Sequence, residues 1–123
     1  MHRHVLVVED DRELRDSLCT ALEDEGIKVV GVEHGQAALT HLRQRPAEDK
    51  PCLILLDLMM PVMDGATFRR EQLKDPALAA IPVVVITAGG KSLASAVPAN
   101  GVLHKPFRMD AVVSVIDRIC GPA

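Results

Sequence analysis

Short continuous apolar runs alternate along the chain with segments in which apolar residues recur every three or four positions. The runs at 5–8, 52–56 and 83–86 are typical of strands that are buried on both faces. Between Leu14 and Leu22 the apolar residues instead follow helical spacing, which predicts an amphipathic helix. The pattern therefore changes repeatedly between the two kinds of element.

The same pattern predicts the other elements and several of their ends. Asp11 is expected to cap the first helix at its start, and Gly26 lies where a left-handed residue would end it. Asp11 and Asp64, each taken singly, are more typical of helix caps than of a catalytic site. Two further strands are predicted at 27–32 and 102–103, and three further helices at 36–44, 64–74 and 108–119.

Strands that alternate with helices are joined by parallel crossovers, so the predicted fold is a doubly wound α/β sheet with helices on both faces. The 123 residues suffice for one domain, which we expect to span 1–123. Segment 89–100 is rich in Gly, Ser and Pro, which predicts a shortened or irregular fourth helix.

Charge and composition exclude several classes of function. Fourteen Lys and Arg against 17 Asp and Glu give a net charge of −3, and the basic residues are scattered, which disfavours direct nucleic-acid binding. The apolar runs are too short to span a bilayer, and no signal peptide is recognisable, so we expect a cytoplasmic protein with no membrane partner.

Three cysteines, Cys19, Cys52 and Cys120, lie far apart in the sequence. Their odd number and the absence of a short paired spacing favour buried thiols over a zinc site or a disulfide.

Polar residues follow four of the predicted strands. Glu9 and Asp10 follow the first, Asp57 ends the third, Thr87 ends the fourth and Lys105 follows the fifth. Ligands of open α/β sheets bind beyond the carboxyl ends of the strands, so these side chains are expected at one edge. Carboxylates without Cys or His favour Mg²⁺, and a cation, an ammonium and a hydroxyl together suit a phosphoryl group. An aspartate can accept that group as an acyl phosphate, and Asp57 is the candidate.

Four segments that include these residues resemble the receiver domains of two-component response regulators. They are Val-Leu-Val-Val-Glu-Asp-Asp (5–11), Leu-Asp-Leu-Met-Met-Pro-Val-Met-Asp-Gly (56–65), Ile-Pro-Val-Val-Val-Ile-Thr-Ala (81–88) and Lys-Pro-Phe (105–107). The resemblance implies a flavodoxin-like, five-stranded parallel sheet in the strand order 2-1-3-4-5.

The resemblance also implies a role for each acidic residue. Asp57 would be the phosphoacceptor, and Glu9 and Asp10 would form the acidic pair that holds Mg²⁺, for which Mn²⁺ can substitute. The direct ligands would be Asp10, Asp57 and the backbone carbonyl of Met59.

Two further residues match the family's phosphoryl-binding positions. The hydroxyl of Thr87 would move to the phosphoryl group, and Lys105 would pair with that group. The peptide bond before Pro106 is often cis in the family and is therefore a candidate cis bond here.

The chain departs from the family pattern at positions concerned with switching. Val102 stands where an aromatic residue is usual, and Thr87 and Lys105 are only eighteen residues apart. Met59 and Gly89 occupy positions that tune loss of the phosphoryl group, and Ala88 belongs to the same switch set. The two departures, Val102 and the short spacing between Thr87 and Lys105, lead us to expect an unusual readout of phosphorylation.

The implied function is a signalling domain rather than an enzyme with a separate substrate. It would accept a phosphoryl group from a histidine kinase or histidine phosphotransfer protein, catalyse only its own phosphotransfer and autodephosphorylation, and switch a partner-binding surface. A stand-alone receiver fits best, with a protein output partner, although a fused output domain outside this chain is also compatible. One alternative is a receiver-like interaction module that no longer signals by phosphorylation. Another is a small phosphatase or nucleotide-binding protein, which the missing Gly-rich loop after the first strand disfavours.

Overall fold

The computed structural model describes residues 3–88 and 97–121 of the chain. The strands are β1 (His4–Val8), β2 (Lys28–Val32), β3 (Leu53–Asp57), β4 (Val83–Thr87) and β5 (Gly101–His104). The α-helices of this part of the chain are α1 (Arg12–Asp24), α2 (Gly35–Arg43), α3 (Gly65–Lys74) and α5 (Met109–Cys120), and a 3₁₀ helix covers Ala47–Asp49.

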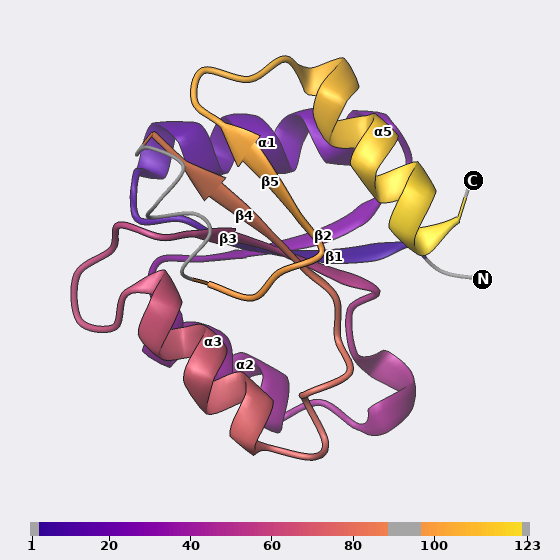
Figure 1. Ribbon diagram of the computed structural model, residues 1–123. Coiled ribbons are helices and arrows are strands. Elements are labelled where there is room, and N and C mark those ends of the chain that lie inside the picture. Colours follow the sequence, from indigo (N-terminus) through magenta and orange to yellow (C-terminus); the bar gives the residue numbers. More distant parts are fainter. Residues whose placement is uncertain (1–2, 89–96, 122–123) are drawn as a thin grey trace.

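The five strands form one parallel sheet in the order β2-β1-β3-β4-β5. Helices α1 and α5 cover one face of this sheet, and α2 and α3 cover the other (Figure 1). The predicted doubly wound, flavodoxin-like fold with its 2-1-3-4-5 order is therefore confirmed. The prediction of a shortened fourth helix falls mainly on residues 89–96, which lie outside the described residues.

Two hydrophobic clusters hold the layers together, one on each face of the sheet. Side chains alternate between the faces of a strand, so Val5 and Val7 of β1 join one cluster while Leu6 and Val8 join the other. All five residues of β1, β3 and β4 are buried, as expected for central strands covered by helices on both sides. These strands form a rigid base for whatever follows their carboxyl ends.

The helix caps follow the local sequence signals. Asp11 and Asp64 accept hydrogen bonds from the backbone N–H groups of Leu14 and Thr67, at 3.2 and 2.8 Å, so the cap assignments are confirmed. Gly26 follows α1 with φ of +78°, the left-handed conformation that was predicted for it. The cap of α2 was not predicted: His34 Nδ1 accepts from the N–H of Ala37.

The cysteine prediction is wrong, because Cys52 and Cys120 form a disulfide. The two residues are 68 positions apart in sequence, but their Cα atoms lie 5.5 Å apart. Cys52 directly precedes β3 and Cys120 ends α5, so tertiary packing makes a pair that no local spacing reveals. Cys19 remains a free thiol, as expected for an odd number.

No helix in the described ranges is long and apolar enough to cross a membrane.

Candidate acidic site at the carboxyl edge of the sheet

Three carboxylates meet where β1 and β3 end. These strands are neighbours, and their register pairs Val8 with Leu56, so the residues that follow, Glu9 and Asp57, lie side by side. A carboxylate oxygen from each of Glu9, Asp10 and Asp57 lies within 4.8 Å of the others. Glu9 and Asp57 are buried, whereas Asp10 is exposed. The convergence predicted for these three residues is therefore observed.

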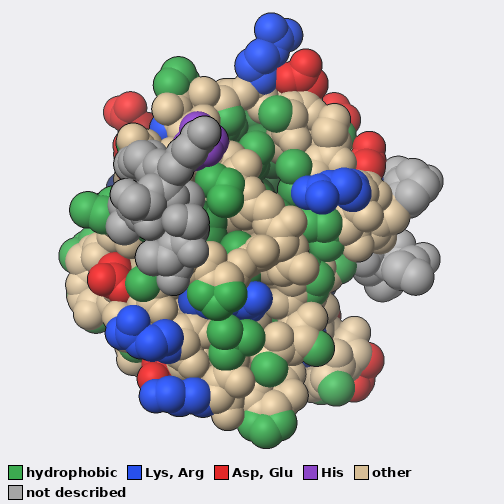
Figure 2. Space-filling view, in the orientation of Figure 1, with side chains coloured by type: hydrophobic (Ala, Val, Ile, Leu, Met, Phe, Trp, Pro, Cys, Tyr) green, Lys and Arg blue, Asp and Glu red, His purple; other side chains and the backbone are tan. Residues whose placement is uncertain are grey.

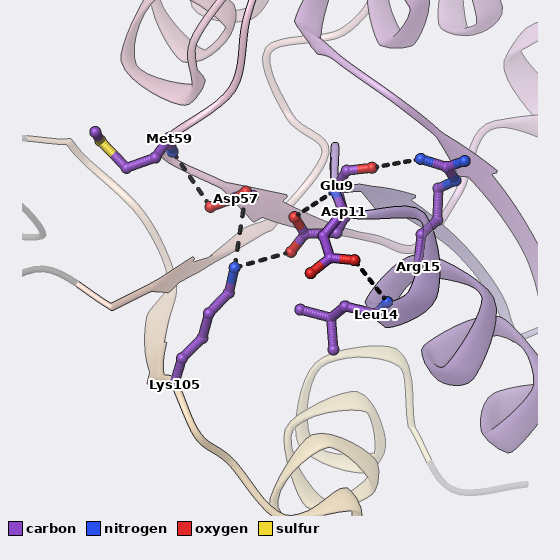
Figure 3. A network of polar contacts seen from close by, with 7 residues as sticks. All are labelled: Glu9, Asp11, Leu14, Arg15, Asp57, Met59 and Lys105. Atoms are coloured by element: carbon purple, nitrogen blue, oxygen red, sulfur yellow. Dashed lines mark hydrogen bonds and ion pairs between the residues drawn. The ribbon is translucent and has the colours of Figure 1, made fainter.

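Lys105 reaches this cluster from the loop after β5 (Figure 3). Its Nζ lies 3.1 Å from Glu9 Oε1 and 3.8 Å from Asp57 Oδ2, so it is nearer to the glutamate than to the predicted phosphoacceptor. Partial burial lowers the pKa of Lys105, but the surrounding carboxylates outweigh this effect and raise it overall. The lysine therefore stays charged. The Lys105–Pro106 peptide bond is cis, as predicted.

Asp57 is held in an environment that disfavours its charge. Burial raises the pKa of Asp57 to about 8, and the neighbouring Glu9 carboxylate acts in the same direction. Two groups oppose this rise: the N–H of Met59, which donates to Asp57 Oδ1 at 3.2 Å, and the ammonium of Lys105. A carboxyl with a pKa near neutrality and a specific charged neighbour is typical of a functional site.

The backbone around Glu9 fixes its position. The N–H of Asp11 donates to Glu9 Oε2 at 3.2 Å, and Arg15 Nη1 donates to the Glu9 carbonyl at 2.9 Å (Figure 3). The backbone N–H of Glu9 donates to the Val32 carbonyl at 3.0 Å. Sequence reasoning did not identify Arg15, whose only signal is its place in the first turn of α1. Its contact ties that helix to the acidic residues.

The loop between β3 and α3 folds back onto Asp57. A Cβ on Gly65 would lie 2.6 Å from the Asp57 carbonyl oxygen and 2.8 Å from Leu58 Cα, so only glycine fits. In the same loop Val62 has φ of +66° and is 81 % exposed. A β-branched residue seldom adopts this left-handed conformation, which shows that the loop is strained.

The remaining predicted site residues lie on β4, on β5 and beside the acidic cluster. Thr87 is buried at the end of β4, and its carbonyl accepts a hydrogen bond from the N–H of Lys105 at 2.9 Å. Ala88, which follows it, is exposed. Val102 lies in β5 and is 39 % exposed, and Met59 is 66 % exposed. Gly89 lies outside the described residues, so its tuning role is not tested.

The cluster has the chemistry of a divalent cation site. Its donors are carboxylate oxygens from Glu9, Asp10 and Asp57, with one ammonium nearby, so negative charge exceeds positive charge. The Glu9 carboxylate raises the pKa of Asp57, and a bound cation would stabilise the ionised form of Asp57. An all-oxygen donor set suits Mg²⁺ better than zinc. These three residues could therefore hold a metal ion.

Five parallel strands with helices on both faces and an acidic cluster at the carboxyl edge define a flavodoxin-like domain. A sequence profile of the response regulator receiver domain matches residues 5–117. The chain thus belongs to the response regulator receiver family, whose members are signalling modules of two-component systems rather than conventional enzymes.

Two curated relatives illustrate the range of this family. The phosphate regulon transcriptional regulatory protein PhoB of Escherichia coli (strain K12) is 37 % identical over 91 residues, which cover 74 % of this chain and 38 % of PhoB. The chain thus spans well under half of that relative. The response regulator receiver protein CpdR of Brucella abortus (strain 2308) is 31 % identical over 119 residues, which cover 95 % of this chain and 96 % of CpdR.

A solved structure agrees with the fold. The signal receiver domain of a signal transduction histidine kinase from Syntrophus aciditrophicus superposes with a TM-score of 0.85 at 28 % identity. The match covers 94 % of this chain and 88 % of that one.

Proposed function

We propose that the domain accepts a phosphoryl group on Asp57 from a phosphohistidine donor, with Mg²⁺ held by Glu9, Asp10, Asp57 and the carbonyl of Met59. One observation carries this proposal: a buried aspartate ends the central strand β3 beside two carboxylates and one ammonium, at the edge where α/β sheets bind ligands. Mn²⁺, which prefers similar oxygen ligands, would serve in the same place. The wider context also supports it, because receiver domains accept phosphoryl groups from histidine kinases.

The transfer requires Asp57 as an anion. One of its carboxylate oxygens forms a bond to phosphorus while the bond from phosphorus to the histidine nitrogen breaks, and the nitrogen keeps the electron pair. Lys105 favours the ionised form, since its ammonium lies 3.8 Å from Asp57 Oδ2. Bound Mg²⁺ supplies positive charge that balances the phosphoryl oxygens.

Lys105 and Thr87 would then bind the transferred group. In the unphosphorylated state the Lys105 ammonium pairs more closely with Glu9 than with Asp57, at 3.1 against 3.8 Å. A phosphoryl group on Asp57 adds charged oxygens near this ammonium and gives it a stronger partner. The Thr87 hydroxyl is the hydrogen-bond donor that we assign to the same oxygens. Because Lys105 follows β5, its movement would carry the signal towards that strand.

Several other residues would set the readout and the lifetime of the phosphorylated state. Met59, which is 66 % exposed beside Asp57, would control the approach of water for autodephosphorylation, together with Gly89. Ala88 and Val102 would take part in switching the partner surface. Val102 has no aromatic ring to move between two positions, so the change at β5 would be smaller than in most relatives.

The rest of the proposal concerns context. We assign residues 1–123 to one cytoplasmic receiver domain that signals through a protein partner or a fused output domain. The match to PhoB supports the second arrangement, because PhoB is a transcriptional regulator that this chain matches over only part of its length. Direct nucleic-acid binding is not expected. On the face seen in Figure 2, Lys and Arg side chains lie in separate groups with Asp and Glu among them.

Intact mass spectrometry tests the proposal directly. The protein is incubated with a small phosphoramidate, with Mg²⁺ or with a chelator, and we expect a Mg²⁺-dependent gain of one phosphoryl group. Asp57→Asn should abolish this gain. Asp64→Asn is the matched control, because Asp64 caps α3 and does not belong to the acidic cluster, so this variant should still be labelled. Absence of labelling, under conditions that label another receiver, would contradict the proposal and favour the interaction-module alternative.

A further inference from the structure

The Cys52–Cys120 disulfide lies at the opposite edge of the sheet from the acidic cluster. Cys52 directly precedes β3, whose far end carries Asp57, and Cys120 is the last residue of α5. In Figure 1 the C-terminal end of α5 lies close to the start of β1. Cys52 is fixed independently of the disulfide, because its backbone N–H donates to the His4 carbonyl at 2.8 Å. The disulfide therefore joins a fixed point to the end of a helix.

Most of α5 is held on the sheet by other contacts. Val112 and Ile116 are fully buried, and Asp117 forms an ion pair with Arg3 near the start of β1. Beyond Asp117 the packing weakens: Ile119 is only partly buried, and Gly121 ends the helix with φ of +85°. The last turn thus depends on the disulfide much more than the rest of the helix does.

The fold itself does not need this covalent bond. Each face of the sheet carries a cluster of at least twelve buried apolar residues, which is a core of the kind that larger domains build without disulfides. Reduction would also leave Cys52 in place, since its Sγ lies 3.2 Å from the His4 carbonyl and a thiol there can donate to it. Both the oxidised and the reduced chain can therefore keep the same sheet.

We propose that Cys52 and Cys120 form a reversible redox pair, and that its state decides whether the last turn of α5 is fastened to the base of β3. On oxidation one sulfur–sulfur bond forms between them. The two thiols lose two protons and two electrons to a low-molecular-weight disulfide of the glutathione type, which leaves as two thiols, and reduction is the reverse exchange. Both cysteines are partly exposed, so small thiols can reach them.

Cys19 does not compete in this exchange. It lies on α1, and its Sγ would be 3.0 Å from a Cβ on Gly31, so it is packed against β2. Burial raises the pKa of Cys19, and Glu23 and Asp16 add to the rise. Cys19 is also partly exposed, but the thiolate is the reactive form of cysteine, so its raised pKa makes it the less reactive thiol. Cys19→Ser is accordingly the matched control for both partners of the pair.

The test uses the full chain equilibrated in glutathione buffers of graded reduction, with alkylation and intact mass to count the thiols. We expect the disulfide to form and to be reduced within this range of glutathione buffers while the protein stays folded. Reduction should lower Tm by about 10 °C. Hydrogen exchange should rise most in residues 118–121, by about tenfold or more, because these residues are held mainly by the disulfide. Cys52→Ser and Cys120→Ser should abolish the response, whereas Cys19→Ser should retain it.

Three results would overturn the proposal. The thiols could stay free in fully oxidised glutathione, the bond could resist reduced glutathione in the folded protein, or reduction could unfold the whole sheet. The outcome is independent of phosphoryl transfer, because Asp57→Asn should keep the redox response and Cys120→Ser should keep labelling at Asp57.

Discussion

At the carboxyl edge of the sheet, three carboxylates share one nearby lysine, whereas the amino edge pairs groups that attract or bond to each other. There, Arg3 pairs with Asp117, Arg45 lies 3.1 Å from Asp49, and a disulfide joins β3 to α5. Both edges are built on the same buried strands. The difference lies in the residues that follow or precede those strands. The carboxyl edge is suited to bind a ligand, whereas the groups of the amino edge already have partners in the protein.

The pKa values of two aspartates, one at each edge, show this contrast. Burial and the Glu9 carboxylate raise the pKa of Asp57 to about 8. Slight desolvation also raises the pKa of Asp49, but Arg45 and Lys28 outweigh it and bring the pKa below its ordinary value. The protein therefore disfavours the anion at one edge and favours it at the other. A bound cation or phosphoryl group can offset the unfavourable charge of Asp57, whereas the charge of Asp49 is already stabilised without a ligand.

The largest expected effect comes from closing the space beside Asp57. In Gly65→Ala the new Cβ would collide with the backbone of Asp57 and Leu58, which cannot move without shifting β3, so we expect a loss of about 3 kcal/mol in the free energy of unfolding. Gly101→Ala is the control at the amino edge, because its nearest contact is the flexible end of Arg118 at 3.3 Å. Urea titration measures both. Equal losses would mean that both edges are packed alike.

Asp57→Asn should stabilise the protein when no metal is present. The folded pKa of about 8 exceeds the ordinary 3.8, so the stabilising contribution of Asp57 is complete below about pH 4 and is lost as the pH rises to 8. Asparagine does not ionise, so at pH 8 with a chelator the variant should be more stable by about 2 kcal/mol. At pH 4 the two proteins should converge.

Denaturant midpoints across this pH range provide the measurement. Added Mg²⁺ should reduce the difference in stability between the Asp57→Asn variant and the wild type. It stabilises the wild type, since it binds the ionised carboxylates. Asp49→Asn is the matched change at the amino edge and should lower stability at pH 7, because the pKa of Asp49 is lowered. A loss of stability in Asp57→Asn at pH 8 would refute the assignment of a strained carboxylate.

The histidines of the amino edge should give a pH dependence of opposite sign. Burial lowers the pKa of both His4 and His41 below 6.5, and neighbouring cations add to the effect. Their contribution is complete above the unfolded value of about 6.5 and is lost as the pH falls through the folded values. Between pH 7.5 and 5 this contribution should fall, whereas that of Asp57 rises, so the decline is measured in the Asp57→Asn background, which removes the opposing change. The double variant His4→Gln/His41→Gln should flatten this decline, and an unchanged slope would exclude these groups.

The smallest expected effect concerns the strained loop beside the acidic cluster. Asparagine tolerates a left-handed backbone better than valine, so Val62→Asn should raise the free energy of unfolding by about 0.7 kcal/mol. Val102→Asn is the control in a strand, where asparagine is disfavoured and should lower stability. Thermal unfolding measures both variants. A gain at position 62 with a loss at position 102 shows that relief of backbone strain at Val62, and not a general tolerance of asparagine at exposed valines, causes the effect.

Local patterns in the sequence predicted the elements and the content of the acidic cluster. The periods of apolar residues and the cap residues depend on neighbours a few positions away. They therefore located the strands, the helices and the helix ends at Asp11, Gly26 and Asp64. Parallel strands end at one edge, and the sequence therefore also predicted that Glu9 and Asp57 would meet.

Only the tertiary structure decided which distant groups became partners. The Cys52–Cys120 bond, the closer pairing of Lys105 with Glu9 than with Asp57, and the raised pKa of Asp57 all depend on how helices and loops pack against the sheet. Distances and burial of this kind arise from the folding of the whole chain. Sequence spacing carries no information about them, because residues 68 positions apart can lie in contact or on opposite faces of the same domain.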